Sequence, residues 1–183
     1  MRFTEVLVLG TALIVCELAT AEVVSAEAGG FKMISKVVVA ASREDAWHAA
    51  VKDVDKWWSA DHTISGDAGR LHISAKPLGC FCEDLGKAAG VVHMTVTMVY
   101  PPTVIRLTGG LGPLGLMGVD GNMTWEFDDL AGDTQITFTY AVGGYRKGGL
   151  DAMAEPVDAV ITDALKRLQA YIDTGDPEYS HLE

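Results

Sequence analysis

The sequence is short of basic residues and lacks several catalytic signatures. Lysine and arginine total 14 against 25 aspartates and glutamates, which gives a formal net charge of −11. An acidic chain repels phosphate backbones, which disfavours nucleic-acid binding, and no basic run offers a patch for a membrane surface. The motifs G-x-S-x-G and G-x-x-x-x-G-K-(S/T) are absent, so serine-type acyl transfer and phosphoryl transfer have no support.

Internal repeats, low-complexity linkers and a dinucleotide fingerprint are missing as well. Residues 110–115 spell G-L-G-P-L-G, but they contain Pro113 and no helical period begins there, so we predict no cofactor. Hydrophobic residues make up 49% of the 183 residues and charged residues 21%. This balance is typical of a globular protein with one sizeable core.

The first 26 residues have the layout of a secretory signal. Arg2 precedes an apolar run over residues 6–15, and small residues follow at Ala21 and Ala26. The run is shorter than the roughly 20 residues that cross a bilayer. We therefore predict a signal peptide over residues 1–26, cleaved after Ala21 or Ala26, and export to the periplasm or the exterior. The alternative is an uncleaved helix that anchors the chain in a membrane.

The remaining sequence predicts one domain over residues 31–175 and a polar tail over residues 176–183. Residues 32–41 are rich in β-branched side chains and favour a strand. Ser42 favours the start of a helix, with acids in its first turn, and a second short helix is expected at residues 54–58.

The second half of the domain changes from strand patterns to a helix. Segments of alternating apolar and polar residues run to Gly144, separated by glycine, proline and aspartate. A helical period then begins near Val157 and ends near Gly175. These patterns predict an α+β fold, in which a curved antiparallel sheet of about six to seven strands wraps around a long C-terminal helix.

Alternation with period two assigns side chains to the two faces of this sheet. The residues expected on the apolar face are Met94, Val96, Met98 and Tyr100, then Met123, Trp125 and Phe127, and then Ile136, Phe138, Tyr140 and Val142. By the same rule His72 and His93 should face away from the apolar side.

The chain resembles the START-like, or SRPBCC, superfamily over about residues 33–173, in the order of its elements, in its closing helix and in four segments. These segments read SREDAWHAAVKDVDKWW, GDAGRLHIS, GCFCE and GNMTWEFDDLAGDTQITFTYAVGGY. The rhythm from Trp125 to Tyr140 is similar to that of Hsp90-ATPase activators and polyketide cyclases. The resemblance implies a helix-grip fold whose helix and concave sheet face enclose a cavity for an apolar ligand.

The candidate site residues follow from this expected cavity. The ligand-binding candidates are Trp57, Trp58, Phe81, Met94, Met98, Trp125, Phe127, Phe138 and Tyr140. Tyr140 would need a hydrogen-bond partner inside, which a ligand could supply. Glu83 shares the face of Phe81, and we expect burial to raise its pKa, as in a general acid or base. His62 is a weaker acid–base candidate in a loop near the entrance.

Cys80 and Cys82 point the same way on one strand. Their Cα atoms should lie about 6.6 Å apart, which disfavours a disulfide between them. A zinc site would need further ligands, for which His72 or His93 would serve if either shares their face. The favoured interpretation is a pair of reduced cysteines that pack as small residues.

Three functions fit these residues and the resemblance. The first is an exported protein that binds a small apolar or aromatic molecule. The second is a cyclase, hydratase or isomerase that uses Glu83, His62 or Tyr140, so enzymatic activity is left open. The third is a partner-binding regulator related to Hsp90 activators. This function is disfavoured because those proteins act in the cytosol, whereas we expect this chain to be exported. We expect no nucleic-acid partner and no membrane contact beyond the signal segment.

Overall fold

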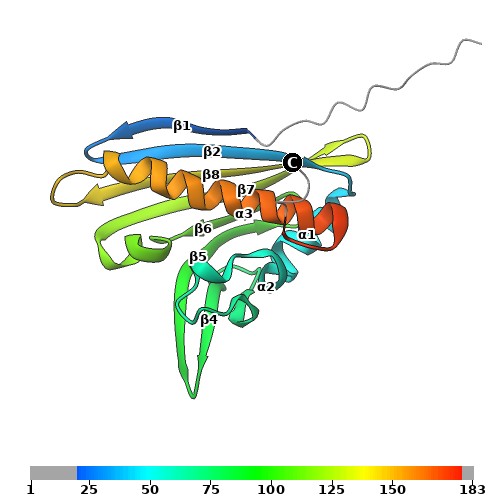
Figure 1. Cartoon of the computed structure of the whole chain (residues 1–183), viewed down its shortest axis with the longest axis horizontal. Coiled ribbons are helices and arrows are strands. Elements are labelled where there is room, and N and C mark those ends of the chain that lie inside the picture. The colour runs from blue at the N-terminus through cyan, green and yellow to red at the C-terminus, as the bar shows by residue number, and fades with distance from the viewer. Residues whose placement is uncertain (1–19, 179–183) are drawn as a thin grey trace, which may run out of the picture.

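The fold is α+β, with one antiparallel sheet and helices on one of its faces (Figure 1). The structure is a computed structural model that describes residues 20–178, so residues 1–19 of the predicted signal and residues 179–183 of the predicted tail lie outside it. The eight strands follow the order β1-β2-β8-β7-β6-β5-β4-β3. They are β1 (Thr20–Glu27), β2 (Gly30–Val39), β3 (Leu71–Ile73), β4 (Cys80–Gly86), β5 (Ala89–Tyr100), β6 (Val104–Thr108), β7 (Gly118–Leu130) and β8 (Asp133–Tyr145).

The α-helices begin and end at residues whose chemistry suits those positions. They are α1 (Arg43–Lys52), α2 (Val54–Trp57) and α3 (Ala154–Thr174), with short 3-10 turns η1 (Ala60–His62), η2 (Ala68–Arg70), η3 (Gly112–Leu116) and η4 (Asp151–Met153). The Ser42 hydroxyl caps α1 by accepting a hydrogen bond from the Asp45 N–H at 3.2 Å. Gly175 ends α3 in the left-handed conformation that glycine adopts most readily, with φ of 83°.

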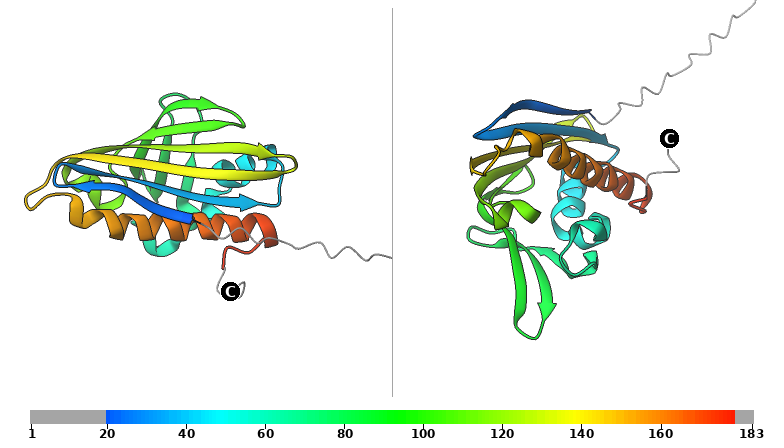
Figure 2. Two further views of the ribbon diagram at one scale, coloured as in Figure 1. Left: turned by 90° about the horizontal axis from the view of Figure 1, so that it is seen from above. Right: turned by 60° about the vertical axis from the view of Figure 1, so that its left-hand side comes forward.

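Helix α3 covers the concave face of the sheet (Figure 2). Its buried side chains recur every three or four residues, as a helix with one apolar side requires, and include Ile161, Ala164, Leu165 and Leu168. Helices α1 and α2 cover a further part of the same face, and the core lies between the helices and the sheet. No helix within residues 20–178 is long and apolar enough to cross a membrane.

Strand β1 is not among the strands that the sequence predicts, and it adds one strand to the edge of the sheet. It pairs with β2 from Thr20 opposite Lys36 to Glu27 opposite Gly30. Its side chains are exposed, apart from that of Val23. Residues 20–26 belong to the predicted signal, so cleavage after Ala21 would keep six of the strand's eight residues and cleavage after Ala26 would leave one.

A β-bulge in β5 overturns the predicted orientation of two side chains. The pairing of β5 with β6 shifts between Val96 and Met98, so that Thr97 is an extra residue. Met98 consequently lies opposite the exposed Arg106. Met98 is 42% exposed and Tyr100 is 67% exposed, which removes both from the apolar face and Met98 from the predicted ligand-binding set.

The packing of α3 on the sheet gives a stability prediction. The side chain of Leu168, on α3, is fully buried. Leu168→Ala should lower the free energy of unfolding by about 2–5 kcal/mol, because the shorter side chain leaves a cavity. Leu116 is 93% exposed, and Leu116→Ala should change the same quantity by less than about 0.5 kcal/mol. Urea denaturation measures both, and equal effects would contradict the assigned packing.

Candidate functional site

The concave face carries a continuous cluster of aromatic rings. Trp125 stacks on Phe138 with ring centroids 4.4 Å apart, and Trp57 lies 6.1 Å from Trp125. The cluster continues towards β4, because Trp58 meets Phe81 edge-on at 5.2 Å. Eight of the nine predicted ligand-binding side chains are buried in this layer, and Met98 is the exception.

These aromatic side chains pack on one another, and they line neither of two hollows in the described part of the surface. One open hollow of about 270 Å³ lies beside β3, β4 and β5, and its lining includes His72, Cys82 and Val92. A second, of about 290 Å³, lies between β1 and the start of α3 and is lined partly by Val23 and Ala154. None of the nine predicted ligand-binding residues lines either hollow.

Three buried side-chain polar atoms have no hydrogen-bond partner among the described residues, and the first is Nε of Arg43 on α1. The other two belong to β7 and α3. One is the indole Nε1 of Trp125, at the centre of the aromatic cluster. The other is Oδ1 of Asp158 on α3, and burial raises the pKa of that carboxyl group. Asp158 lies between the buried Ala154 and Ile161 at helical spacing, so it belongs to the side of α3 that faces the sheet. A buried donor without an acceptor is unfavourable and uncommon.

Tyr140 finds its hydrogen-bond partners in the backbone, not in a ligand. Its hydroxyl donates to the Gly109 carbonyl at 3.0 Å and accepts from the Leu111 N–H at 3.0 Å. Burial, helped by the charge of Asp120, raises the Tyr140 pKa to about 12, although the Leu111 N–H opposes this shift. Tyr140 thereby fastens the glycine-rich segment 109–117 over one end of the concave face.

Glu83 is a buried charged group whose carboxylate has three hydrogen-bond partners among the described residues. Its buried carboxylate accepts hydrogen bonds from the backbone N–H of Ile64 at 3.0 Å and of Ser65 at 2.5 Å. His93 Nε2 lies 3.0 Å from the same carboxylate. Burial alone would raise the Glu83 pKa, but hydrogen bonds from Ser65, Ile64 and His93 outweigh it and lower the pKa to about 2. The predicted inward orientation is confirmed, and the predicted rise in pKa is wrong.

A second β-bulge in β5 brings His93 to Glu83. Phe81 lies opposite Met94 and Cys82 opposite Val92, so that His93 is the extra residue. The prediction that His93 faces away from the interior is therefore wrong: its side chain is only 7% exposed, and its ring centroid lies 5.5 Å from that of Phe81. Sequence alternation could not reveal this pair, because alternation assumes an unbroken strand.

His62 does not join Glu83 and His93. It is exposed in η1, and its carbonyl accepts a hydrogen bond from Trp58 Nε1 at 3.2 Å. The loop that follows supplies the Ile64 and Ser65 donors instead. This region contributes to the site through its backbone, which no residue motif indicates.

Cys80 and Cys82 form a disulfide, which corrects the prediction of two reduced thiols. Their Cα atoms lie 5.4 Å apart, closer than in a regular strand and within the range that a disulfide spans. The bond closes a loop of three residues within one strand. In the chain-entropy account so short a loop stabilises the fold by about 1.6 kcal/mol, against about 3 kcal/mol for fifteen residues.

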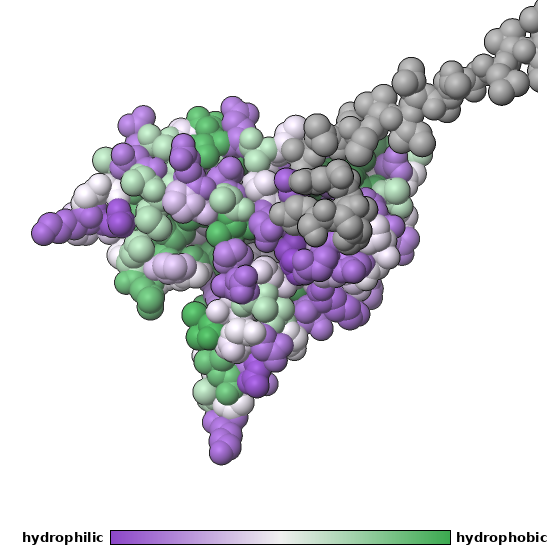
Figure 3. All heavy atoms as spheres, viewed as in Figure 1, coloured by the Kyte–Doolittle hydropathy of each residue, from purple (hydrophilic) through white to green (hydrophobic). Residues whose placement is uncertain are grey.

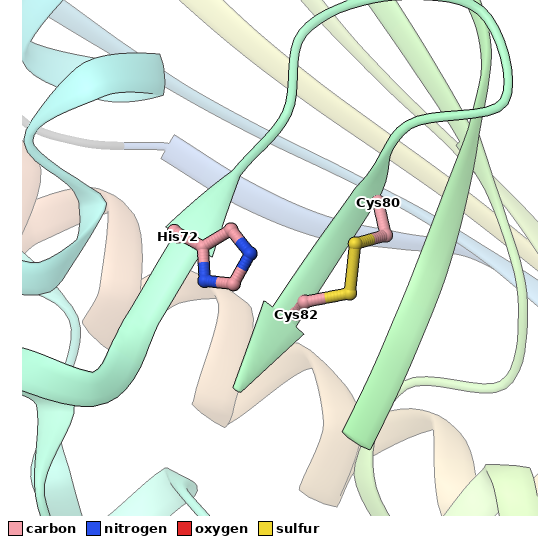
Figure 4. A group of neighbouring side chains, drawn as sticks. All are labelled: His72, Cys80 and Cys82. Carbon is pink, nitrogen blue, oxygen red and sulfur yellow. A yellow bond between two sulfur atoms is a disulfide. The ribbon is translucent and has the colours of Figure 1, made fainter. Parts of the chain in front are cut away.

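His72 lies beside this disulfide on the outer face of the sheet (Figure 4). It is exposed between the buried Leu71 and Ile73, as alternation predicts, and it lies opposite Cys82 in the neighbouring strand. The imidazole nitrogen and the two sulfur atoms lie within 4.8 Å of one another. Of the two histidines considered as partners for the cysteines, His72 shares their face and His93 lies on the other.

The antiparallel sheet and its covering C-terminal helix define a helix-grip fold of the START-like, or SRPBCC, superfamily. Within that superfamily, the chain belongs to the family described as polyketide cyclase / dehydrase and lipid transport, whose family model matches residues 31–173. A sequence comparison with curated proteins finds no match.

Solved structures with the same fold include three that illustrate its range. A conserved protein of unknown function from Enterococcus faecalis has a TM-score of 0.59 and 14% identity, over 86% of this chain and 78% of its own. CalU16 from Micromonospora echinospora has a TM-score of 0.53 and 16% identity, over 90% of this chain and 88% of its own. DynU16, from the dynemicin biosynthetic locus, has a TM-score of 0.54 and 21% identity, over 80% of this chain and 48% of its own.

The lowered pKa of Glu83 gives a pH-dependent prediction. Because its pKa falls from 4.5 to about 2 on folding, the charged carboxylate stabilises the protein above pH 4.5, and this stabilisation is lost as pH falls towards 2. Glu83→Gln should therefore lower the free energy of unfolding by up to about 3 kcal/mol at pH 7, and the difference should shrink below pH 4.5.

The matched control is Glu126→Gln, which changes an exposed carboxylate on β7. Urea denaturation between pH 2.5 and pH 7 should show a change below about 0.5 kcal/mol for this variant. A pH-independent effect of Glu83→Gln would contradict the assigned role of its charge.

Proposed function

We propose that the chain binds a small apolar or aromatic molecule that carries a hydrogen-bond acceptor, on the concave face beneath α3. The unpaired indole N–H of Trp125 is the observation that carries this proposal. The donor lies among aromatic rings that would stack on a flat ligand, and an acceptor on the ligand would satisfy it. The family's description, which includes polyketide cyclases and lipid transport, fits such a ligand.

Helix α3 carries a second polar atom without a partner among the described residues. Asp158 lies on α3 with one unpaired carboxylate oxygen, and its raised pKa makes a protonated, hydrogen-donating form more accessible. A ligand beneath α3 that reached Asp158 would gain a polar group from the helix as well as the donor of Trp125 from the sheet. Small-molecule sites are typically lined by apolar side chains and a few polar groups in fixed positions.

The segment 109–117 is the part of the cover that would yield to admit the ligand. Gly109 and Gly112 adopt positive φ values of 145° and 59°, and Leu114 is buried while Leu116 is 93% exposed. The Tyr140 hydroxyl holds this segment by two hydrogen bonds. Breaking them would free Leu114 to leave the core and open that end of the concave face.

Export is part of the proposal because the N-terminal pattern of residues 1–26 is typical of a secretory signal. A periplasmic or extracellular protein of this kind would sequester or carry its ligand outside the cytoplasm.

An acid–base enzyme is the second candidate, and the Glu83–His93 pair favours it. A buried carboxylate that orients an imidazole is a recurring arrangement in proton transfer, in which the imidazole moves the proton. His93 contacts Phe81, which continues into the aromatic cluster, so a bound ligand could extend towards it. The family's description names cyclases and dehydrases, which are enzymes, and so fits this candidate as well.

The binding proposal predicts that prodan, an aromatic ketone with environment-sensitive fluorescence, binds the protein with a blue-shifted emission. Trp125→Phe keeps an aromatic ring and removes the donor, so it should weaken prodan binding about fivefold. Trp47→Phe is the control, because Trp47 packs on Phe127 at the edge of the cluster, and it should change affinity less than about twofold. Absence of prodan binding, or equal affinity in the Trp125→Phe variant, would contradict the proposal.

The two candidate functions predict different effects of His93→Gln. For a binding protein, prodan affinity should stay within about twofold of the wild type, because His93 does not take part in the proposed hydrogen bond between the ligand and the Trp125 indole. For an enzyme, turnover of an aromatic polyketide intermediate should fall at least about a hundredfold while that affinity is retained. Turnover that survives the substitution would remove His93 from the second candidate.

A further inference from the structure

The outer face of β3 and β4 holds a group of metal-binding side chains that the proposed function does not use. His72, Cys80 and Cys82 each offer one ligand atom, and these three atoms lie within 4.8 Å of one another. Figure 4 shows the imidazole on β3 beside the two sulfur atoms on β4. The pairing of His72 with Cys82 across the two strands fixes this arrangement.

The disulfide does not join separate parts of the fold. Cys80 and Cys82 are two residues apart in one strand, so the backbone already holds them together. Reduction would therefore leave the strand pairing of β4 with β3 and β5 in place. Both thiols would remain on the face that His72 shares.

We propose that reduction of the Cys80–Cys82 disulfide creates a zinc site from the two thiolates and the imidazole of His72. A dithiol supplies two electrons and two protons, which break the S–S bond and give two thiols, while the dithiol becomes a disulfide. Zn²⁺ then displaces the two thiol protons to solvent and bonds to both sulfur atoms and to one imidazole nitrogen. The oxidised pair has no thiolate to offer, so metal binding depends on the redox state.

The dimensions of the site suit this metal. Tetrahedral zinc with Zn–S bonds of about 2.3 Å places two sulfur ligands about 3.8 Å apart. Two cysteines with Cα atoms 5.4 Å apart on one strand face can meet this spacing once the S–S bond opens. Thiolate and imidazole are the ligands that zinc prefers, and three protein ligands leave a fourth position for water.

The space for that fourth ligand adjoins the cluster. The open hollow of about 270 Å³ is lined by His72 and Cys82 and bordered by Asp84. Asp84 is exposed, and its carboxylate adds negative charge at the rim, which favours a cation. His72 is exposed as well, so both the metal and a reductant can reach the site from solvent.

Cobalt(II) titration of reduced protein tests the proposal in a Cys16→Ser background, where Cys80 and Cys82 are the remaining cysteines. Reduced protein should bind one equivalent of Co²⁺ with thiolate-to-metal charge-transfer absorption in the near ultraviolet, and Zn²⁺ should displace it. The oxidised protein should show no such absorption. Zn²⁺ should also protect both thiols from iodoacetamide, as measured by mass spectrometry.

Variants separate the three ligands from general effects. Cys80→Ser should abolish the charge-transfer absorption of the one-to-one complex, and His72→Ala should weaken zinc binding at least about tenfold. His62→Ala changes another exposed histidine and should leave affinity unchanged. Circular dichroism checks that each variant is folded. The proposal would be overturned if the reduced protein failed to bind one equivalent of metal, or if His72→Ala left the metal affinity unchanged.

Discussion

The carboxylate of Glu83 is excluded from solvent, and its charge can remain in the interior only where donors surround it. The donors come from distant parts of the chain, because Ile64 and Ser65 belong to the loop after α2 and His93 to β5. The hydrogen bonds that satisfy this charge therefore hold the loop against β4, and the bulge in β5 brings His93 to the same carboxylate. Strand β4 also meets the end of α2 where Trp58 contacts Phe81, with ring centroids 5.2 Å apart.

The remaining cover of the concave face relies on apolar burial. Helix α3 lies over one part of the face, and the glycine-rich segment 109–117 closes one end through the hydroxyl of Tyr140. Under this cover the aromatic side chains fill the layer, and the indole N–H of Trp125 is left without a partner among the described residues. The interior thus holds an unsatisfied donor among packed rings, and a ligand that displaced part of this packing would supply its acceptor.

The fold was largely predictable because alternating strands and an amphipathic helix leave strong sequence signals. The inward orientation of Glu83 and the burial of Trp125 and Phe138 followed from the same alternation. The two bulges of β5 were not predictable, since one extra residue reverses the alternation without any marker in the sequence, and they account for the errors at Met98 and His93. The disulfide was missed because an ideal strand spaces its residues too widely, whereas β4 is locally compressed.

The central claim is that the concave face beneath α3 binds the ligand through the indole of Trp125. Nitrogen-15 NMR of the tryptophan indole groups tests it most directly, since the chain has four tryptophans that single substitutions can assign. On addition of prodan, the Trp125 indole signal should move downfield as it gains an acceptor. The signal of the Trp57 indole, which already donates a hydrogen bond to the Ala49 carbonyl, should move less. An unmoved Trp125 signal, with shifts confined to the amides of residues 89–92 around the outer hollow, would contradict the account.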